Sequence, residues 1–290
     1  MAVKMRRHRG AWWAIAAGAV TLACGLSSPE TPAPAPAPAA PPPQPATLPP
    51  AGYVLAWADE FDGTTLDTGK WTAESGTRRD AVMTPAAAQV KDGLLTVTTF
   101  TEAGTHYTAF LTTQDRYLTT FGYIEARIMF QDSPGEWCAF WLFSPTNGNP
   151  LGNPAVAGTE IDMVEHRVTD QGGWTALKDM VALNLNWDGY GADMKNRQRV
   201  LPLPGNAPVQ GVWHTYGVLW TATSYTFYVD ANPLWTSTDA VSHAAESIQL
   251  TCEVTDQSWA GNVPPGGYGS RAASSTHMLV DWVRVWKPGS

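Results

Sequence analysis

The stretch EIDMVEHR, Glu160–Arg167, places three carboxylates in a run that otherwise has the apolar composition of a β-strand. Charged side chains are seldom fully buried, so they mark an unusual surface. Side chains an even number of residues apart share a strand face, which puts Asp162 with Glu160 but turns Glu165 away. A β-bulge at one of the two residues before Glu165 would return it to that face, and bulges are enriched beside active sites. We therefore expect all three acids to line one surface.

Two acids on one concave face, with a third between them, are the groups that a retaining glycosidase needs. Its two working carboxyl groups stand ~5–5.5 Å apart, so these side chains would have to lean inward from a curved sheet. We assign Glu160 as the nucleophile, Glu165 as the acid/base and Asp162 as the neighbour that separates their pKa values. One alternative is a strand whose acids only face water. The other, a metal site of Asp162, Glu165 and His166, is less favoured because adjacent residues in a strand diverge.

Other landmarks surround the acidic stretch in a fixed order. They are Trp57–Gly63 with Lys70 and Trp71, Gly122–Arg127, Gly135–Leu142, His214–Gly217 with Trp220, Phe227–Asp230, and Val280–Trp286. Taken in this order, they make the chain similar to glycoside hydrolase family 16 from about Trp57 to Trp286, in the form with the pattern Glu-x-Asp-x-x-Glu. The resemblance implies the same three catalytic roles.

The expected fold class is all-β. Turn residues separate short strand-like runs from Ala51 onward, and no long helical period is present. The family resemblance implies a two-sheet antiparallel β-sandwich, a concanavalin-like jelly roll with a concave substrate cleft. Cys138 stands where the family usually has proline, and Asn184 and Asn186 stand in the strand where many members present a histidine. These departures bear on substrate specificity.

Tryptophans are the expected walls of the cleft, because the apolar faces of sugar rings stack on indole. Trp137 matches the family's tryptophan beside the cleavage point, and Trp187 and Trp259 are further candidates. The remaining tryptophans of the strand-like runs are expected to pack in the core.

Polar candidates for the substrate site lie near the acids. Asn184 and Asn186 share a strand face and could donate hydrogen bonds to sugar hydroxyls, although such asparagines often satisfy backbone groups instead. His166 could orient a neighbouring carboxylate, and a purely structural histidine is the alternative.

No cofactor is expected to be required for catalysis. The family resemblance implies a possible structural calcium away from the cleft, with Glu60, Gly93 and Asp281 as candidate ligands. Hard cations need several oxygens, so an ordinary hydrogen-bonded aspartate is at least as good an interpretation of Asp281.

The N-terminal region is expected to lie outside the catalytic domain. Residues 1–23 carry a basic segment and a short apolar run, which is typical of an export signal. Residues 24–50 form a linker rich in proline and alanine, and residues 51–290 form the domain. Cys24 follows a lipobox-like sequence, so either a lipid anchor or plain cleavage is expected. The predicted location is extracytoplasmic, for a secreted or membrane-anchored bacterial lipoprotein that is monomeric.

Net charge limits the partners. The chain carries −8, and removing the four basic residues of positions 1–23 gives −8 − 4 = −12. Nucleic acid is excluded as a partner, because binding phosphates requires a basic face. A polyanionic polysaccharide such as carrageenan is disfavoured, so a neutral one is expected.

Two cysteines remain beyond Cys24. Cys138 and Cys252 could form a disulfide in an oxidising compartment or stay as two buried thiols, and sequence does not decide between these states.

The predicted function is an endo-acting retaining hydrolase of a neutral β-linked polysaccharide, most simply a glucan with β-1,3 linkages. A family enzyme acting on an agar-type galactan is one alternative. A carbohydrate-binding module without hydrolysis is another, since fold does not fix activity.

Overall fold

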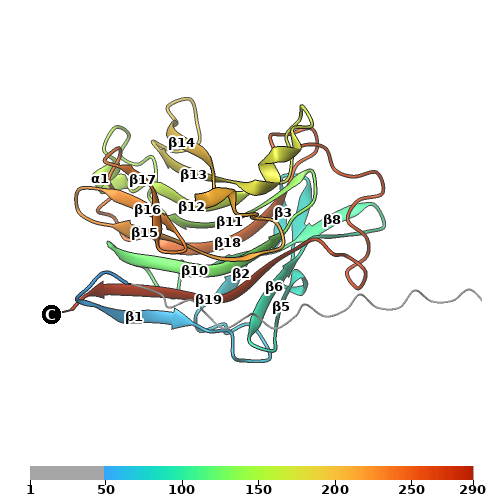
Figure 1. The fold of residues 1–290 in the computed structure, drawn as a ribbon, viewed down its shortest axis with the longest axis horizontal. Coiled ribbons are helices and arrows are strands. Elements are labelled where there is room, and N and C mark those ends of the chain that lie inside the picture. The colour runs from blue at the N-terminus through green and yellow to red at the C-terminus, as the bar shows by residue number, and fades with distance from the viewer. Residues whose placement is uncertain (1–48, 290) are drawn as a thin grey trace, which may run out of the picture. The chain divides into compact units, whose positions relative to one another are not determined.

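A computed structural model of the chain describes residues 49–289 (Figure 1). The predicted export signal, Cys24 and nearly all of the linker lie outside the described residues. Within the described part, no helix is long and apolar enough to cross a membrane.

Two large antiparallel sheets form the sandwich, and a small third sheet lies beside them. The eight-stranded sheet runs in the order β17 (Asn232–Ser237), β16 (Tyr225–Val229), β15 (Trp213–Trp220), β10 (Gly122–Gln131), β19 (His277–Pro288), β6 (Leu94–Thr98), β5 (Ala88–Lys91), with β1 (Tyr53–Asp59) also paired to β19. The seven-stranded sheet runs in the order β14 (Lys195–Pro202), β13 (Met180–Trp187), β12 (Glu160–His166), β11 (Glu136–Phe143), β18 (Ser247–Val254), β9 (Phe110–Thr112), β2 (Thr72–Ala73).

The third sheet has four strands: β3 (Gly76–Arg78), β4 (Ala81–Met83), β8 (Thr105–Thr108) and β7 (Phe100–Glu102). Its β4–β8 pair is parallel, unlike the other strand pairs described. The helical segments are short: η1 (Pro85–Ala87), α1 (Pro154–Ala157), η2 (Thr175–Asp179) and η3 (Pro204–Asn206). The predicted all-β sandwich is therefore confirmed.

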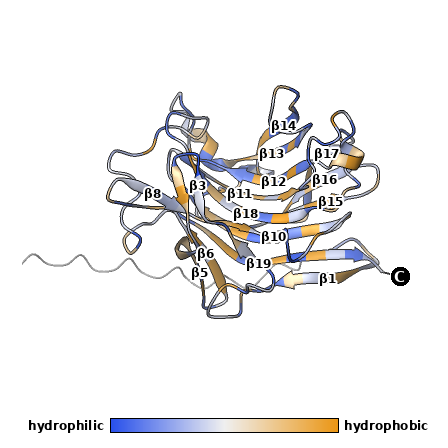
Figure 2. Cartoon of the chain, turned by 180° about the vertical axis from the view of Figure 1, so that it is seen from behind, coloured by the Kyte–Doolittle hydropathy of each residue, from blue (hydrophilic) through white to orange (hydrophobic). Residues whose placement is uncertain are grey.

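Alternation of apolar and polar residues sets the main core between the two large sheets. Figure 2 shows apolar and polar segments following one another along β10, β18 and β19. The inward residues of β10 are fully buried: Ile124, Ala126, Ile128 and Phe130. They pack with Phe140 and Leu142 of β11 and with Val218 and Trp220 of β15. Burying each isoleucine, leucine, valine or phenylalanine side chain of this set contributes about 1.5–3 kcal/mol before entropy is counted.

The outer face of β10 is buried as well as the inner one. Glu125 and Arg127 are each only 2% exposed. The Arg127 guanidinium lies 4.9 Å from the ring centre of Trp213, and a Cβ on Gly217 would stand 3.2 Å from the side chain of Glu125. Aromatic and charged side chains thus cover one another on this face, which period-two patterning alone does not reveal.

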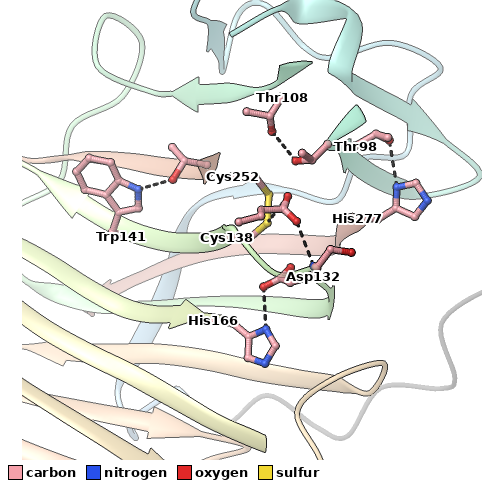
Figure 3. Close-up of a disulfide and its surroundings, with 12 residues drawn as sticks. Thr98, Thr108, Asp132, Cys138, Trp141, His166, Cys252 and His277 are labelled. Carbon is pink, nitrogen blue, oxygen red and sulfur yellow. Dashed lines mark hydrogen bonds and ion pairs between the residues drawn. A yellow bond between two sulfur atoms is a disulfide. The ribbon is translucent and has the colours of Figure 1, made fainter. Parts of the chain in front are cut away.

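A disulfide joins β11 and β18. Cys138 and Cys252 are directly opposite in the pairing of these strands and are bonded through their sulfurs (Figure 3). The structure therefore has the disulfide rather than two free thiols.

Candidate active site

A β-bulge in β12 gathers the three acids of the opening stretch. Asp162 is opposite Trp141 of β11, whereas Val164 is opposite the next residue, Phe140, so Met163 is the extra residue. The pairing with β13 is displaced between Asp162 and Glu165 as well. The expected bulge is confirmed. It places the side chain of Glu165 on the face that carries the other two acids.

That face is the floor of a cavity of about 440 Å³. Seven of the residues predicted for the site line it: Glu160, Asp162, Glu165, Trp137, Asn184, Asn186 and Trp259. The other lining residues are Arg78, Arg79, Ala139, Trp141, Tyr190, Met194, Asn196, Gln198, Thr251 and Glu253. The cavity is open to solvent at its rim, where Tyr190 is 59% and Met194 is 43% exposed.

The asparagines of β13 hold the carboxylates. Asn186 Nδ2 lies 2.7 Å from Oε1 of Glu160 and 3.0 Å from Oδ2 of Asp162, and it donates to both. Asn184 Nδ2 donates to Oε2 of Glu165. The strand register explains this arrangement, because Asn186 is directly opposite Glu160 and Asn184 is opposite Asp162. Asn186 thus uses its amide nitrogen on two acids, whereas Asn184 uses its amide nitrogen on one.

Burial raises the pKa of all three acids. The pKa of Glu165 rises to about 8, because of desolvation first and then the nearby charges of Glu160 and Glu253, while Asn184 opposes the rise. Desolvation and the flanking acids raise the pKa of Asp162 well above its ordinary value. Desolvation also raises the pKa of Glu160, but hydrogen bonds from Tyr190 and Asn186 oppose it. At neutral pH such a set can hold one proton on Glu165 beside an ionised Glu160.

Trp137 and Trp259 form one wall of the cavity, and an arginine packs on each ring. Trp137 and Trp259 meet edge to face with ring centres 5.4 Å apart. The Arg79 guanidinium lies 4.9 Å from the Trp137 ring, and that of Arg167 lies 4.1 Å from the Trp259 ring. Such cation–π contacts hold the rings in fixed orientations, as a wall for stacking on a sugar requires.

A carboxylate held by two arginines was not predicted from the sequence. Arg78 Nε donates to Oε1 of Glu253 at 2.9 Å, and Arg79 pairs with Oε2 of the same side chain. Glu253 is opposite Trp137 in the β11–β18 pairing and is 4% exposed. One signal could have found it: polar residues occupy every second position of β18 at Gln249, Thr251 and Glu253.

Two predicted substrate residues lie elsewhere. The side chain of His166 is fully buried on the opposite face of β12, where it contacts Asp132 and stacks on Phe130 with ring centres 5.0 Å apart. Trp187 packs against the main core and does not line the cavity. Both predictions were wrong for the same reason, since each residue adjoins one that faces the cavity and neighbours in a strand point to opposite sides.

Arginines pair with the acidic side chains of two candidate calcium ligands, Glu60 and Asp281, and a structural calcium stays a prediction. Arg284 donates two hydrogen bonds to the carboxylate of Glu60, both at 2.8 Å, and Arg127 pairs with Asp281 at 2.8 Å. Each acid would have to give up an arginine before it could bind a hard cation. Among the described residues, the one group of at least three metal-ligand types is Glu136, Cys138 and Cys252, and its cysteines are disulfide-bonded.

Comparison with known proteins places this geometry in a family. The family model described as Beta-porphyranase A-D, GH16 domain, matches residues 53–288. Among curated proteins, glucan endo-1,3-beta-glucosidase A1 of Niallia circulans is 24% identical, over 82% of this chain and 38% of its own length. Endo-1,3-1,4-beta-glycanase ExsH of Rhizobium meliloti is 27% identical, over 79% of this chain and 46% of its own length. The chain spans less than half the length of these two relatives.

Solved structures share the fold. The endo-beta-1,3-glucanase of Pyrococcus furiosus has 22% identity and a TM-score of 0.63, with 81% of this chain and 94% of that chain covered. Porphyranase B of Zobellia galactanivorans has 21% identity and a TM-score of 0.64, with 79% and 90% covered. At these identities the likeness concerns the fold, and the family model over residues 53–288 carries the assignment. The chain belongs to glycoside hydrolase family 16.

Proposed function

We propose that the protein is an endo-acting glycoside hydrolase that cleaves a β-linked polysaccharide with retention of configuration. The observation that carries the proposal is the bulge at Met163, which puts Glu160, Asp162 and Glu165 together on the floor of one cavity. In this proposal Glu160 attacks the anomeric carbon while Glu165 protonates the leaving oxygen. Glu165 then takes a proton from water, which attacks the anomeric carbon and releases Glu160 from the glycosyl ester.

The protonation states suit these roles. Burial raises the pKa of Glu165 to about 8, so it carries the proton that a general acid donates at neutral pH. The carboxylate of Glu160 receives hydrogen bonds from Tyr190 and Asn186, which favour its ionised form. Asn186 donates to Asp162 as well as to Glu160, so the protonation of Asp162 influences that of Glu160.

For the substrate we favour a galactan of the agar type over the neutral β-1,3-containing glucan expected from the sequence. The matching family model is described as a beta-porphyranase domain. In the cavity, Arg78 and Arg79 share the single carboxylate of Glu253. A guanidinium pairs well with an anionic substituent. The net charge of the whole chain does not describe this end of the cleft.

A β-1,3-containing glucan is the second candidate. The curated relatives named above are a glucan endo-1,3-beta-glucosidase and an endo-1,3-1,4-beta-glycanase. The packed wall of Trp137 and Trp259 suits the apolar face of a glucose ring as well as that of a galactose ring.

One screen tests the activity and separates the substrates. The protein and its Glu160→Gln variant are incubated with porphyran, agarose, laminarin and lichenan, and new reducing ends are measured together with product lengths. We expect porphyran or agarose to be cleaved fastest into a range of oligosaccharides, and the variant to be inactive. NMR of the first product should show the anomeric configuration of the substrate. Binding without new reducing ends would instead support a carbohydrate-binding module.

We also propose export of the protein, with Cys24 as a lipid attachment site. The basic and apolar segments of residues 1–23 and the lipobox-like sequence before Cys24 support this proposal. Mass spectrometry of the N-terminal peptide from a bacterial host would distinguish an acylated Cys24 from a plain cleaved terminus.

A further inference from the structure

A phenol reaches the carboxylate of Glu160 from the loop between β13 and β14. The hydroxyl of Tyr190 donates to Oε2 of Glu160. The Tyr190 ring is parallel to that of Phe143, with ring centres 6.1 Å apart and 6° between the planes. Asp188 fixes the start of this loop. Its carboxylate accepts hydrogen bonds from Lys195 Nζ and from a backbone N–H of a neighbouring loop, each at 2.7 Å. Contacts at its ring, its hydroxyl and the base of its loop therefore place Tyr190.

The two oxygens of Glu160 have different donors. Oε1 accepts from Asn186 Nδ2 at 2.7 Å, and Oε2 accepts from Tyr190. Desolvation of its hydroxyl, which lies against Glu160, and the charge of Glu160 raise the pKa of Tyr190 above its ordinary value. The phenol thus keeps its proton at any pH at which an enzyme works, and toward a carboxylate it acts as a donor. A donor of this kind stabilises the ionised form of the acid that receives it.

We propose that Tyr190 is a positioning residue that keeps Glu160 ionised and aimed for attack. The proposal rests on the proposed function, in which Glu160 is the nucleophile. The other donor to Glu160, Asn186, comes from the adjacent strand β13, whereas Tyr190 is an exposed loop residue.

The hydrogen bond changes strength along the reaction. When Glu160 forms a bond to the anomeric carbon, the glycosidic C–O bond breaks and the leaving oxygen takes the proton of Glu165. The carboxylate charge of Glu160 disappears in the ester, so the bond from Tyr190 weakens. When water attacks the anomeric carbon and gives its proton to Glu165, the bond between that carbon and the Glu160 oxygen breaks and the charge returns to Glu160. Tyr190 then stabilises it as the departing group.

A purely structural role of Tyr190 predicts different effects of mutation. If Tyr190 served only to pack on Phe143, its ring would matter and its hydroxyl would not. Tyr190→Phe keeps the ring and removes the hydroxyl, while Tyr190→Ala removes both. Tyr268→Phe is a matched control, because Tyr268 also donates from a hydroxyl, to the carbonyl of Pro134 at 3.0 Å, and does not line the cavity.

Two measurements test the proposal on the full chain. The first is the acidic limb of kcat/KM against pH, with the polysaccharide that the wild type cleaves fastest. The second is a ¹³C NMR titration of protein labelled at the glutamate carboxyl carbons, in which the Glu160 signal is the one missing from Glu160→Gln. We expect Tyr190→Phe to move both the limb and the Glu160 midpoint up by about 1 pH unit, the worth of one charge-assisted hydrogen bond. KM should change less than about twofold, and Tyr268→Phe should move neither quantity.

Each other outcome decides against the proposal. An unchanged Glu160 midpoint in Tyr190→Phe overturns it, and so does a midpoint that moves while the acidic limb stays in place. Loss of activity in Tyr190→Ala with wild-type behaviour in Tyr190→Phe assigns a packing role instead. If the wild type cleaves no polysaccharide, the proposed function fails on its own, and the NMR titration still shows whether Tyr190 controls the ionisation of Glu160.

Discussion

Nδ1 of His166 lies 2.8 Å from Oδ2 of Asp132, and neither side chain is exposed to solvent. Nε2 of the same imidazole lies 3.0 Å from the carbonyl oxygen of Lys178. A carbonyl oxygen only accepts, so Nε2 donates to it. This pair, visible in Figure 3, anchors the end of β12 from within the core, one residue beyond Glu165.

Replacing His166 by leucine should therefore destabilise the fold. The change leaves the buried Asp132 carboxyl without its hydrogen-bond partner, which costs about 1–3 kcal/mol. Urea denaturation measures the loss. Glu102→Ala is the control, because Glu102 is an exposed residue of β7, and it should change the free energy of unfolding by less than about 0.5 kcal/mol. A similarly small change in His166→Leu would show that the pair contributes little.

The position of His166 also shows which parts of the site could be predicted from the sequence. The order and spacing of the acids predicted a bulge and a shared face, and both follow from the two-residue period of a strand. By the same rule, His166 follows Glu165 and must face the core. Trp187 follows Asn186 and must face away from the cavity. These two errors came from choosing residues by chemical type rather than by strand face.

The Arg78–Glu253 contact could not have been predicted in this way. The two residues are 175 positions apart, and the side chains meet only because β3 of the small sheet approaches β18. Local periodicity describes the face of each strand but not which strands become neighbours. The contact of Tyr190 with Glu160 could not be predicted for a related reason. Tyr190 lies in a loop, and a loop has no regular period from which side-chain directions follow.

Glu165 should set the alkaline limb of the pH profile. Burial raises the pKa of Glu165 to about 8, and a general acid works only while it is protonated. We therefore expect kcat/KM to be at its plateau well below pH 8 and to fall as the pH rises through about 8. Glu165→Gln should lower kcat about 10²- to 10⁴-fold and remove this limb. An unchanged limb in the variant would assign it to another group.

Asn186→Ala should lower kcat more than it raises KM. Its amide donates to Glu160 and Asp162, so the loss concerns the reacting carboxylates rather than the bound sugar. Loss of a hydrogen bond to a charged group corresponds to a rate decrease of about 10- to 100-fold. Steady-state kinetics on the best polysaccharide give both constants. A raised KM with unchanged kcat would restore the direct contact with sugar expected from the sequence.

Removing the charge of Glu253 should move the alkaline limb to lower pH. The negative charge of Glu253 raises the pKa of Glu165, after desolvation and Glu160, so Glu253→Gln lowers it. The acid then loses its proton at a lower pH, and kcat/KM declines earlier as the pH rises. Glu102→Gln, a change at an exposed residue of β7, should leave the profile in place. A limb that stays put or moves upward in Glu253→Gln would mean that the released arginines rearrange.

The double variant Cys138→Ala/Cys252→Ala should lose stability through its unfolded state. The bonded residues are 114 positions apart, so the disulfide closes a long loop and restricts the unfolded chain strongly. Removing such a bond costs about 2–5 kcal/mol, which urea denaturation can measure against the wild type. Peptide mapping without reductant should recover the two cysteines linked in the wild type, and equal midpoints with unlinked peptides would contradict the bond. Activity should fall at temperatures where the wild type is still folded, because Trp137 of β11 and Glu253 of β18 are each adjacent to a bonded cysteine and line the cavity.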